Sequence, residues 1–243
     1  MRLYLLSLNK YLADNRRSLI LSVAGLMALM IFVGFINAYT SSDIHATHLL
    51  SISFYLGIFA CVRTSLMFSS MKSPRGRIST LMSPASIWQK FAARWTVNVP
   101  VQLLVLFAAF WVAEITRVSL WPLFNDGATA DWFAFTYSEE DHGQYLIGLI
   151  FSSILAAQAF FGFGAIAWPR MSALRSIIAL WLIGIVFGIT SGYVLMHYHF
   201  NWPLFSAERL LMTTIICNIV FTIILWGLAY LRFKESDVID RLF

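Results

Sequence analysis

Long apolar runs separated by short polar segments dominate the chain. A helix needs about 20 apolar residues to cross the hydrocarbon core of a bilayer. The third run is the shortest, and Pro100 suits the first turn of a helix, so we place the start of that span near Pro100. We expect six transmembrane helices, at residues 19–39, 48–68, 99–116, 145–168, 177–196 and 210–231.

The composition indicates the same class of protein. Of the 243 residues, 59% are hydrophobic and 12% are charged, whereas soluble proteins carry about 25% charged residues. A soluble globule is therefore excluded. We predict an all-α integral membrane protein with a single transmembrane domain over residues 1–243.

The distribution of Lys and Arg predicts the orientation. Of these 17 residues, 14 lie in the N-terminal segment, in the loops after spans two and four, and in the tail at 232–243. The positive-inside rule then places both termini in the cytoplasm. The loop at 117–144 lies on the external side and is acidic and aromatic, which is typical of an interfacial cap.

Residues 1–17 have an apolar helical face formed by Tyr4, Leu5, Leu8, Tyr11 and Leu12. This spacing predicts an interfacial helix with its basic residues toward water and headgroups. An ordinary basic flank that only fixes the topology is an equally good interpretation.

The loop between spans two and three, residues 69–96, contains five basic residues and no acidic one. Ser73-Pro74 predicts a short helix ending near Met82. Ser86 and Gln89 have the spacing of a capping box, which predicts a second, interfacial helix. We interpret the loop as a docking platform for a cytoplasmic partner; the alternative is a basic topological anchor.

Two ionisable side chains lie inside the predicted spans, where such groups are functional candidates. Arg63 is near the cytoplasmic end of span two, so we expect its side chain to snorkel to the headgroups. Glu114 is near the external end of span three. Arg117 is one helical turn away and is its expected partner.

Span five carries two consecutive GxxxG steps on one helical face, at Gly184, Gly188 and Gly192. Small residues allow close helix approach in lipid, so this face is expected to contact another helix of this chain or a second copy.

Sites of covalent chemistry are not apparent. The sequence contains no ATP-binding phosphate loop, HExxH or GxSxG motif, so we expect no enzyme activity in this chain. Five histidines lie outside the predicted spans or at their external ends. We interpret them as interfacial loop residues, and an external metal-binding or pH-sensing site is a minor alternative. These histidines are His45, His48, His142, His197 and His199.

The layout and the loop motif together resemble the membrane (permease) subunits of type-two ATP-binding-cassette (ABC) exporters. The motif is residues 76–86, GRISTLMSPAS, followed by Gln89-Lys90-Phe91; the segment from Leu81 to Ser86 is similar to the family's Leu-x-x-Pro-x-Ser stretch. The resemblance implies a cytoplasmic coupling helix in this loop. The residues assigned to ATPase coupling are Arg75, Arg77, Ile78, Thr80, Leu81 and Met82.

The resemblance further implies a dimer with a second copy or a similar permease, bound to separate cytoplasmic ATPase subunits in a prokaryotic plasma (inner) membrane. ATP and Mg would be held by the partner, with no cofactor in this chain. Spans one, two and five would line the path, including the Gly184, Gly188 and Gly192 face. The alternative functions are an ATPase-independent carrier or channel, and a non-transporting sensor or assembly subunit.

Overall fold

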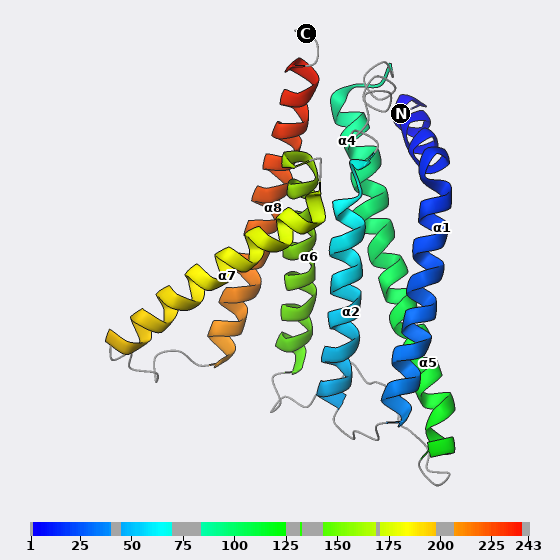
Figure 1. Ribbon diagram of the computed structural model, residues 1–243, viewed down its shortest axis with the longest axis vertical. Helices are drawn as coiled ribbons and strands as arrows, with labels where there is room; N and C mark the ends of the chain where they lie inside the picture. Colours follow the sequence, from blue (N-terminus) through cyan, green and yellow to red (C-terminus); the bar gives the residue numbers. More distant parts are fainter. Residues whose placement is uncertain are drawn as a thin grey trace. The chain divides into compact units, whose positions relative to one another are not determined.

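The structure is a computed structural model that describes residues 2–39, 45–69, 84–124, 132, 143–168, 171–197 and 207–239. All regular secondary structure in these residues is helical (Figure 1). The elements are α1 (Arg2–Tyr39), α2 (His45–Ser65), α4 (Ile87–Thr96), the π-helical segment η2 (Val97–Val101), α5 (Gln102–Phe124), α6 (Gly143–Ala167), α7 (Ser172–His197) and α8 (Ala207–Ile239).

Four of the described helices are long and apolar enough to cross a membrane, as judged by length and composition. They cover Arg2–Tyr39, Ile87–Phe124, Ile147–Ala167 and Arg209–Glu235. Shorter apolar helices occupy Ile52–Ser65 and Ser172–Val186. These helices are compatible with an integral membrane protein.

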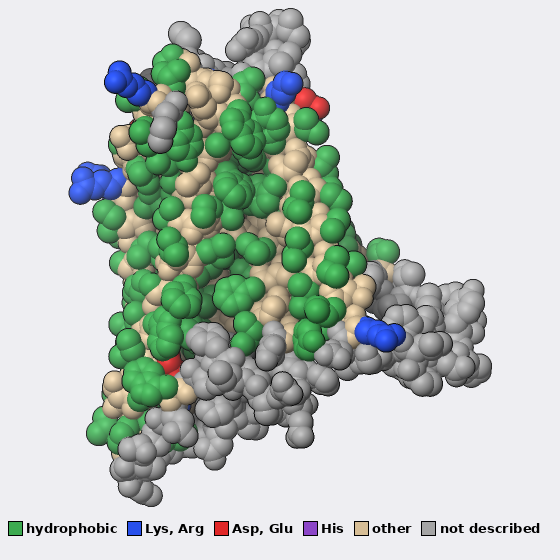
Figure 2. Space-filling view, turned by 180° about the vertical axis from the view of Figure 1, so that it is seen from behind, with side chains coloured by type: hydrophobic (Ala, Val, Ile, Leu, Met, Phe, Trp, Pro, Cys, Tyr) green, Lys and Arg blue, Asp and Glu red, His purple; other side chains and the backbone are tan. Residues whose placement is uncertain are grey.

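Apolar side chains also cover much of the described surface, as Figure 2 shows for one face. Leu21 is 72% exposed and Leu104 is 71% exposed. Exposure of many large apolar side chains is costly in water and suits a lipid environment.

The chain divides into two compact units. Unit 1, Met1–Met67 with Ile78–Phe135, contains α1, α2, α4, η2 and α5; unit 2, Phe68–Arg77 with Thr136–Phe243, contains α6, α7 and α8. In unit 1, α1 packs along α4 and α5, and in unit 2, α6 packs along α8.

Helix α1 runs from Arg2 to Tyr39 without a break, so the basic N-terminal segment and the first apolar run form one helix. Tyr11 on its inner face is buried, whereas Leu5 is 46% exposed and Leu12 is 38% exposed. Residues of the predicted apolar face therefore have different environments: Tyr11 packs against other helices, whereas Leu5 and Leu12 lie on the surface.

Pro100 does not lie in the first turn of a helix as expected, and the point at which this span enters the membrane stays a prediction. Pro100 lies inside η2, which joins α4 to α5 without interruption. Proline lacks an N–H, and its ring would clash with the carbonyl four residues earlier in an α-helix. The wider π-helical turn accommodates the ring and lets the helix continue through it.

Candidate functional site

The predicted coupling residues all lie outside the described residues: Arg75, Arg77, Ile78, Thr80, Leu81 and Met82. The described chain resumes at Pro84, directly before α4. The structure thus describes the helix into which this loop leads.

The start of α4 has the predicted capping box. The Ser86 hydroxyl accepts a hydrogen bond from the Gln89 backbone N–H, and the Gln89 side chain accepts one from the Ser86 N–H, at 3.3 and 3.1 Å. The two bonds satisfy donors that lack helical partners and fix where α4 begins. Trp88 is 58% exposed, whereas Phe91 is 4% exposed.

A buried polar cluster, which we call the arginine–tyrosine cluster, lies where α1, α2, α4 and η2 meet. Its members are Tyr11, Arg63, Arg94 and Asn98, each at most 8% exposed. The Asn98 side-chain nitrogen donates to the Tyr11 hydroxyl and to the Arg94 backbone carbonyl, both at 2.8 Å.

Asn98 has a structural reason to be in this position. Hydrogen bonds of a π-helical segment skip one residue relative to an α-helix, which disturbs the pairing of backbone groups around it. One amide hydrogen of Asn98 adds a donor at the Arg94 carbonyl, which also accepts from the Val97 backbone N–H, while the other ties η2 to α1. A buried amide that is satisfied on both sides specifies the junction rather than weakening it.

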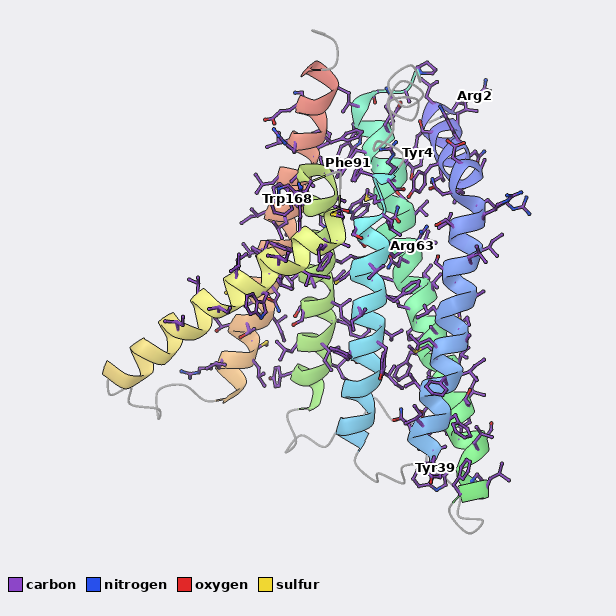
Figure 3. All side chains as sticks on the ribbon, viewed as in Figure 1. Arg2, Tyr4, Tyr39, Arg63, Phe91 and Trp168 are labelled. Carbon is purple, nitrogen blue, oxygen red and sulfur yellow. The ribbon has the colours of Figure 1, made fainter. Side chains whose placement is uncertain are left out.

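Further bonds tie the surrounding helices together. The Thr96 hydroxyl donates to the Ala92 carbonyl, so the Tyr4 hydroxyl is the donor in its 2.9 Å bond to Thr96. Gln102 donates to the Ala60 carbonyl at 3.3 Å, which joins the start of α5 to α2. Figure 3 shows Tyr4 on the side of α1 that faces α4.

Arg63 has a partner inside the protein, and its extension to the headgroups stays a prediction. The residue is 7% exposed, and its guanidinium Nη1 donates to the Ser18 hydroxyl of α1 at 3.2 Å. A hydrogen bond to a neighbouring helix gives one donor of the charged group a partner within the protein. Arg63 therefore holds α2 to α1.

A second polar pair lies on α5. Glu114 accepts two hydrogen bonds from Arg117, from Nε at 3.0 Å and from Nη2 at 2.7 Å. The Arg117 guanidinium also lies 5.8 Å from the ring centroid of Trp121, a cation–π geometry. The predicted pairing of Glu114 with Arg117 is confirmed.

Close helix approach occurs at a glycine that the sequence analysis did not select. A Cβ on Gly34 of α1 would lie 2.5 Å from the Ala113 carbonyl oxygen of α5. By contrast, a Cβ on Gly184 would meet nothing within 4 Å, so the described part of this chain makes no close packing there. Gly188 and Gly192 lie in α7, but their surroundings are outside the description.

The histidine hypothesis stays a prediction. His142 and His199 lie outside the described residues, as do the side chains of His45, His48 and His197. Within the described part of the chain, no group of three or more His, Cys, Asp or Glu residues is placed to hold a metal ion.

Comparison of the chain with protein-family models, curated proteins and solved structures gave no match.

Proposed function

We propose that this chain is the permease subunit of an ATP-driven exporter of the type-two ABC class. In this proposal the chain crosses a prokaryotic inner membrane six times with both termini in the cytoplasm. It pairs with a second copy or a similar permease and binds separate ATPase subunits, which hold ATP and Mg. The chain itself performs no covalent chemistry.

The observation that supports this proposal best is the continuous helix that follows the basic loop and its bonds to neighbouring helices. Helix α4 begins at a capping box whose Ser86 is four residues after Met82, the last residue assigned to coupling, and it continues through η2 into α5. The arginine–tyrosine cluster and the Tyr4–Thr96 bond tie the same segment to α1, and Arg63 ties α1 to α2.

A displacement of the loop would therefore move several membrane helices together. Bonds between buried polar groups resist separation because each group would lose its partner in a medium with little water. Such rigid transmission is what a subunit driven by a separate ATPase requires.

Affinity purification of the full chain from native membranes in mild detergent, followed by mass spectrometry, tests the proposal. We expect a stoichiometric partner with an ATP-binding phosphate loop. The double variant Arg77→Glu with Leu81→Glu should lose that partner or uncouple ATP hydrolysis from transport in proteoliposomes. The matched control is Arg232→Glu, an exposed position on α8, which should retain both.

Two results would reject the proposal. One is an intact, monodisperse preparation with no ATPase, and the other is normal coupling in the double variant. Flux without any ATPase would favour a carrier or channel instead.

A further inference from the structure

A polar site at one end of unit 1 lies at the depth of lipid headgroups. Helix α1 has 38 residues and is about 57 Å long, well beyond the hydrocarbon thickness of about 30 Å. The 22 steps from Arg17 to Tyr39 span about 33 Å, which matches that thickness. Arg17 and Ser18 therefore mark the boundary at which lipid phosphates lie.

Helix α2 contributes a cation at the same level. It ends at Ser65, and Arg63 in its last turn donates to the Ser18 hydroxyl at 3.2 Å. Because that hydroxyl oxygen accepts from Arg63, its own hydrogen remains able to donate. Ser18 and Arg17 are both exposed.

The local charge is positive. Among the described residues of unit 1 the acidic side chains are Asp14 and Glu114. Glu114 pairs with Arg117, and Asp14 lies one turn before Ser18. Arg17, Ser18 and Arg63 thus offer two cations and a hydroxyl donor beside a single nearby carboxylate.

Apolar side chains continue from this site toward the membrane interior. Leu21, one turn after Ser18, is 72% exposed. On α2, Val62 and Ile58 are 44% and 47% exposed on one helical stripe. A donor-rich site followed by exposed apolar surface matches a phosphate joined to acyl chains better than it matches a free anion.

We propose that Arg17, Ser18 and Arg63 form a binding site for the phosphate of an anionic phospholipid. Arginine and hydroxyl donors form charge-assisted hydrogen bonds with phosphate oxygens. A lipid with net negative charge is preferred over a zwitterionic one because the choline cation of the latter is repelled by the two arginines. The site is independent of any transport activity.

Purified full-length protein in mixed micelles tests the proposal, with phosphatidylglycerol and phosphatidylcholine supplied at equal mole fraction. Native mass spectrometry counts the retained lipids, and thermal unfolding gives the accompanying shift in Tm. We expect preferential retention of phosphatidylglycerol. Its retention should fall about fivefold in Arg17→Gln, the effect of one cation at a membrane surface.

The matched control is Arg2→Gln, which removes an exposed cation from the same helix about 22 Å farther along it. Ser18→Ala is expected to weaken retention as well. Arg63→Gln should also weaken retention of phosphatidylglycerol, whereas Arg63→Lys should retain it. If Arg63→Gln does not fold, Arg17→Gln and Ser18→Ala, both at exposed positions, still test whether the site binds the lipid.

Three outcomes would overturn the assignment. Arg17→Gln and Ser18→Ala could retain phosphatidylglycerol as well as Arg2→Gln does. Phosphatidylcholine could be retained equally well. Inorganic phosphate could raise Tm as much as phosphatidylglycerol, which would identify a site for free anions rather than for a lipid.

Discussion

The buried ion pair on α5 allows a quantitative prediction. Glu114 is fully buried and receives two hydrogen bonds from Arg117, which is itself 7% exposed. Glu114→Gln preserves the shape of the side chain but leaves the guanidinium charge buried without its carboxylate. Removal of one partner from a buried pair costs about 3–5 kcal/mol, so we expect a loss of that size in the free energy of unfolding.

The double variant is the sharper test. Glu114→Gln combined with Arg117→Met removes both charges and replaces them with groups of similar volume. The residual cost should be about 1 kcal/mol, mainly the lost interaction of the guanidinium with Trp121. The double variant should therefore be more stable than either single variant.

Unfolding by a denaturing detergent in mixed micelles, followed by tryptophan fluorescence, measures these differences. The control is Arg232→Gln, because the Arg232–Glu235 pair is exposed and such pairs contribute at most about 1 kcal/mol. The reasoning would be refuted by two results together. Each single variant would lose no more free energy of unfolding than the control does, and the loss in the double variant would equal the sum of the two single losses. The pair would then be a solvated contact rather than a buried one.

Two further predictions concern helix packing in unit 1. Tyr11→Phe removes the hydroxyl that accepts from Asn98 and should cost about 1–3 kcal/mol of unfolding free energy in the same assay; an unchanged value would mean that the bond does not hold the helices together. Gly34→Ala places a methyl group against a backbone carbonyl of α5 and should cost about 1–3 kcal/mol, whereas Gly25→Ala on the same helix meets nothing within 4 Å and should be near neutral. Equal effects of the two alanines would contradict the close approach of α1 and α5.

Features that depend on neighbouring residues could be predicted from the sequence. The capping box needs only Ser86 and Gln89 three residues apart, and the ion pair needs only Glu114 and Arg117 one turn apart. In both cases the helix itself brings the groups together, whatever the rest of the fold does. The all-helical class follows in the same way, from long apolar runs that contain few charges.

The arginine–tyrosine cluster could not be predicted in this way. Its Tyr11–Asn98 bond joins residues 87 positions apart, and the periodicity of residues 1–17 indicates only that Tyr11 lies on an apolar face. That face could lie on lipid or on another helix, and the sequence pattern is the same in both cases. The signal that was missed is the polar pair Asn98 and Gln102 at the start of an apolar run, because buried amides need partners from elsewhere in the fold.

The position of Pro100 inside a helix and the contacts of Asn98 belong to the same irregular turn. A proline inside a helix lacks the N–H that would bond a carbonyl of the preceding turn, and the π-helical turn widens the backbone around it. In the same turn the Asn98 side chain donates one amide hydrogen to the Arg94 carbonyl, which also accepts from the Val97 N–H, and the other to Tyr11 on α1. The irregular turn therefore adds a polar link between η2 and α1 beside the Tyr4–Thr96 bond. For this reason a regular α-helix at 97–101 would be expected to weaken the connection between the loop-proximal helix and α1, even if it made α5 itself more regular.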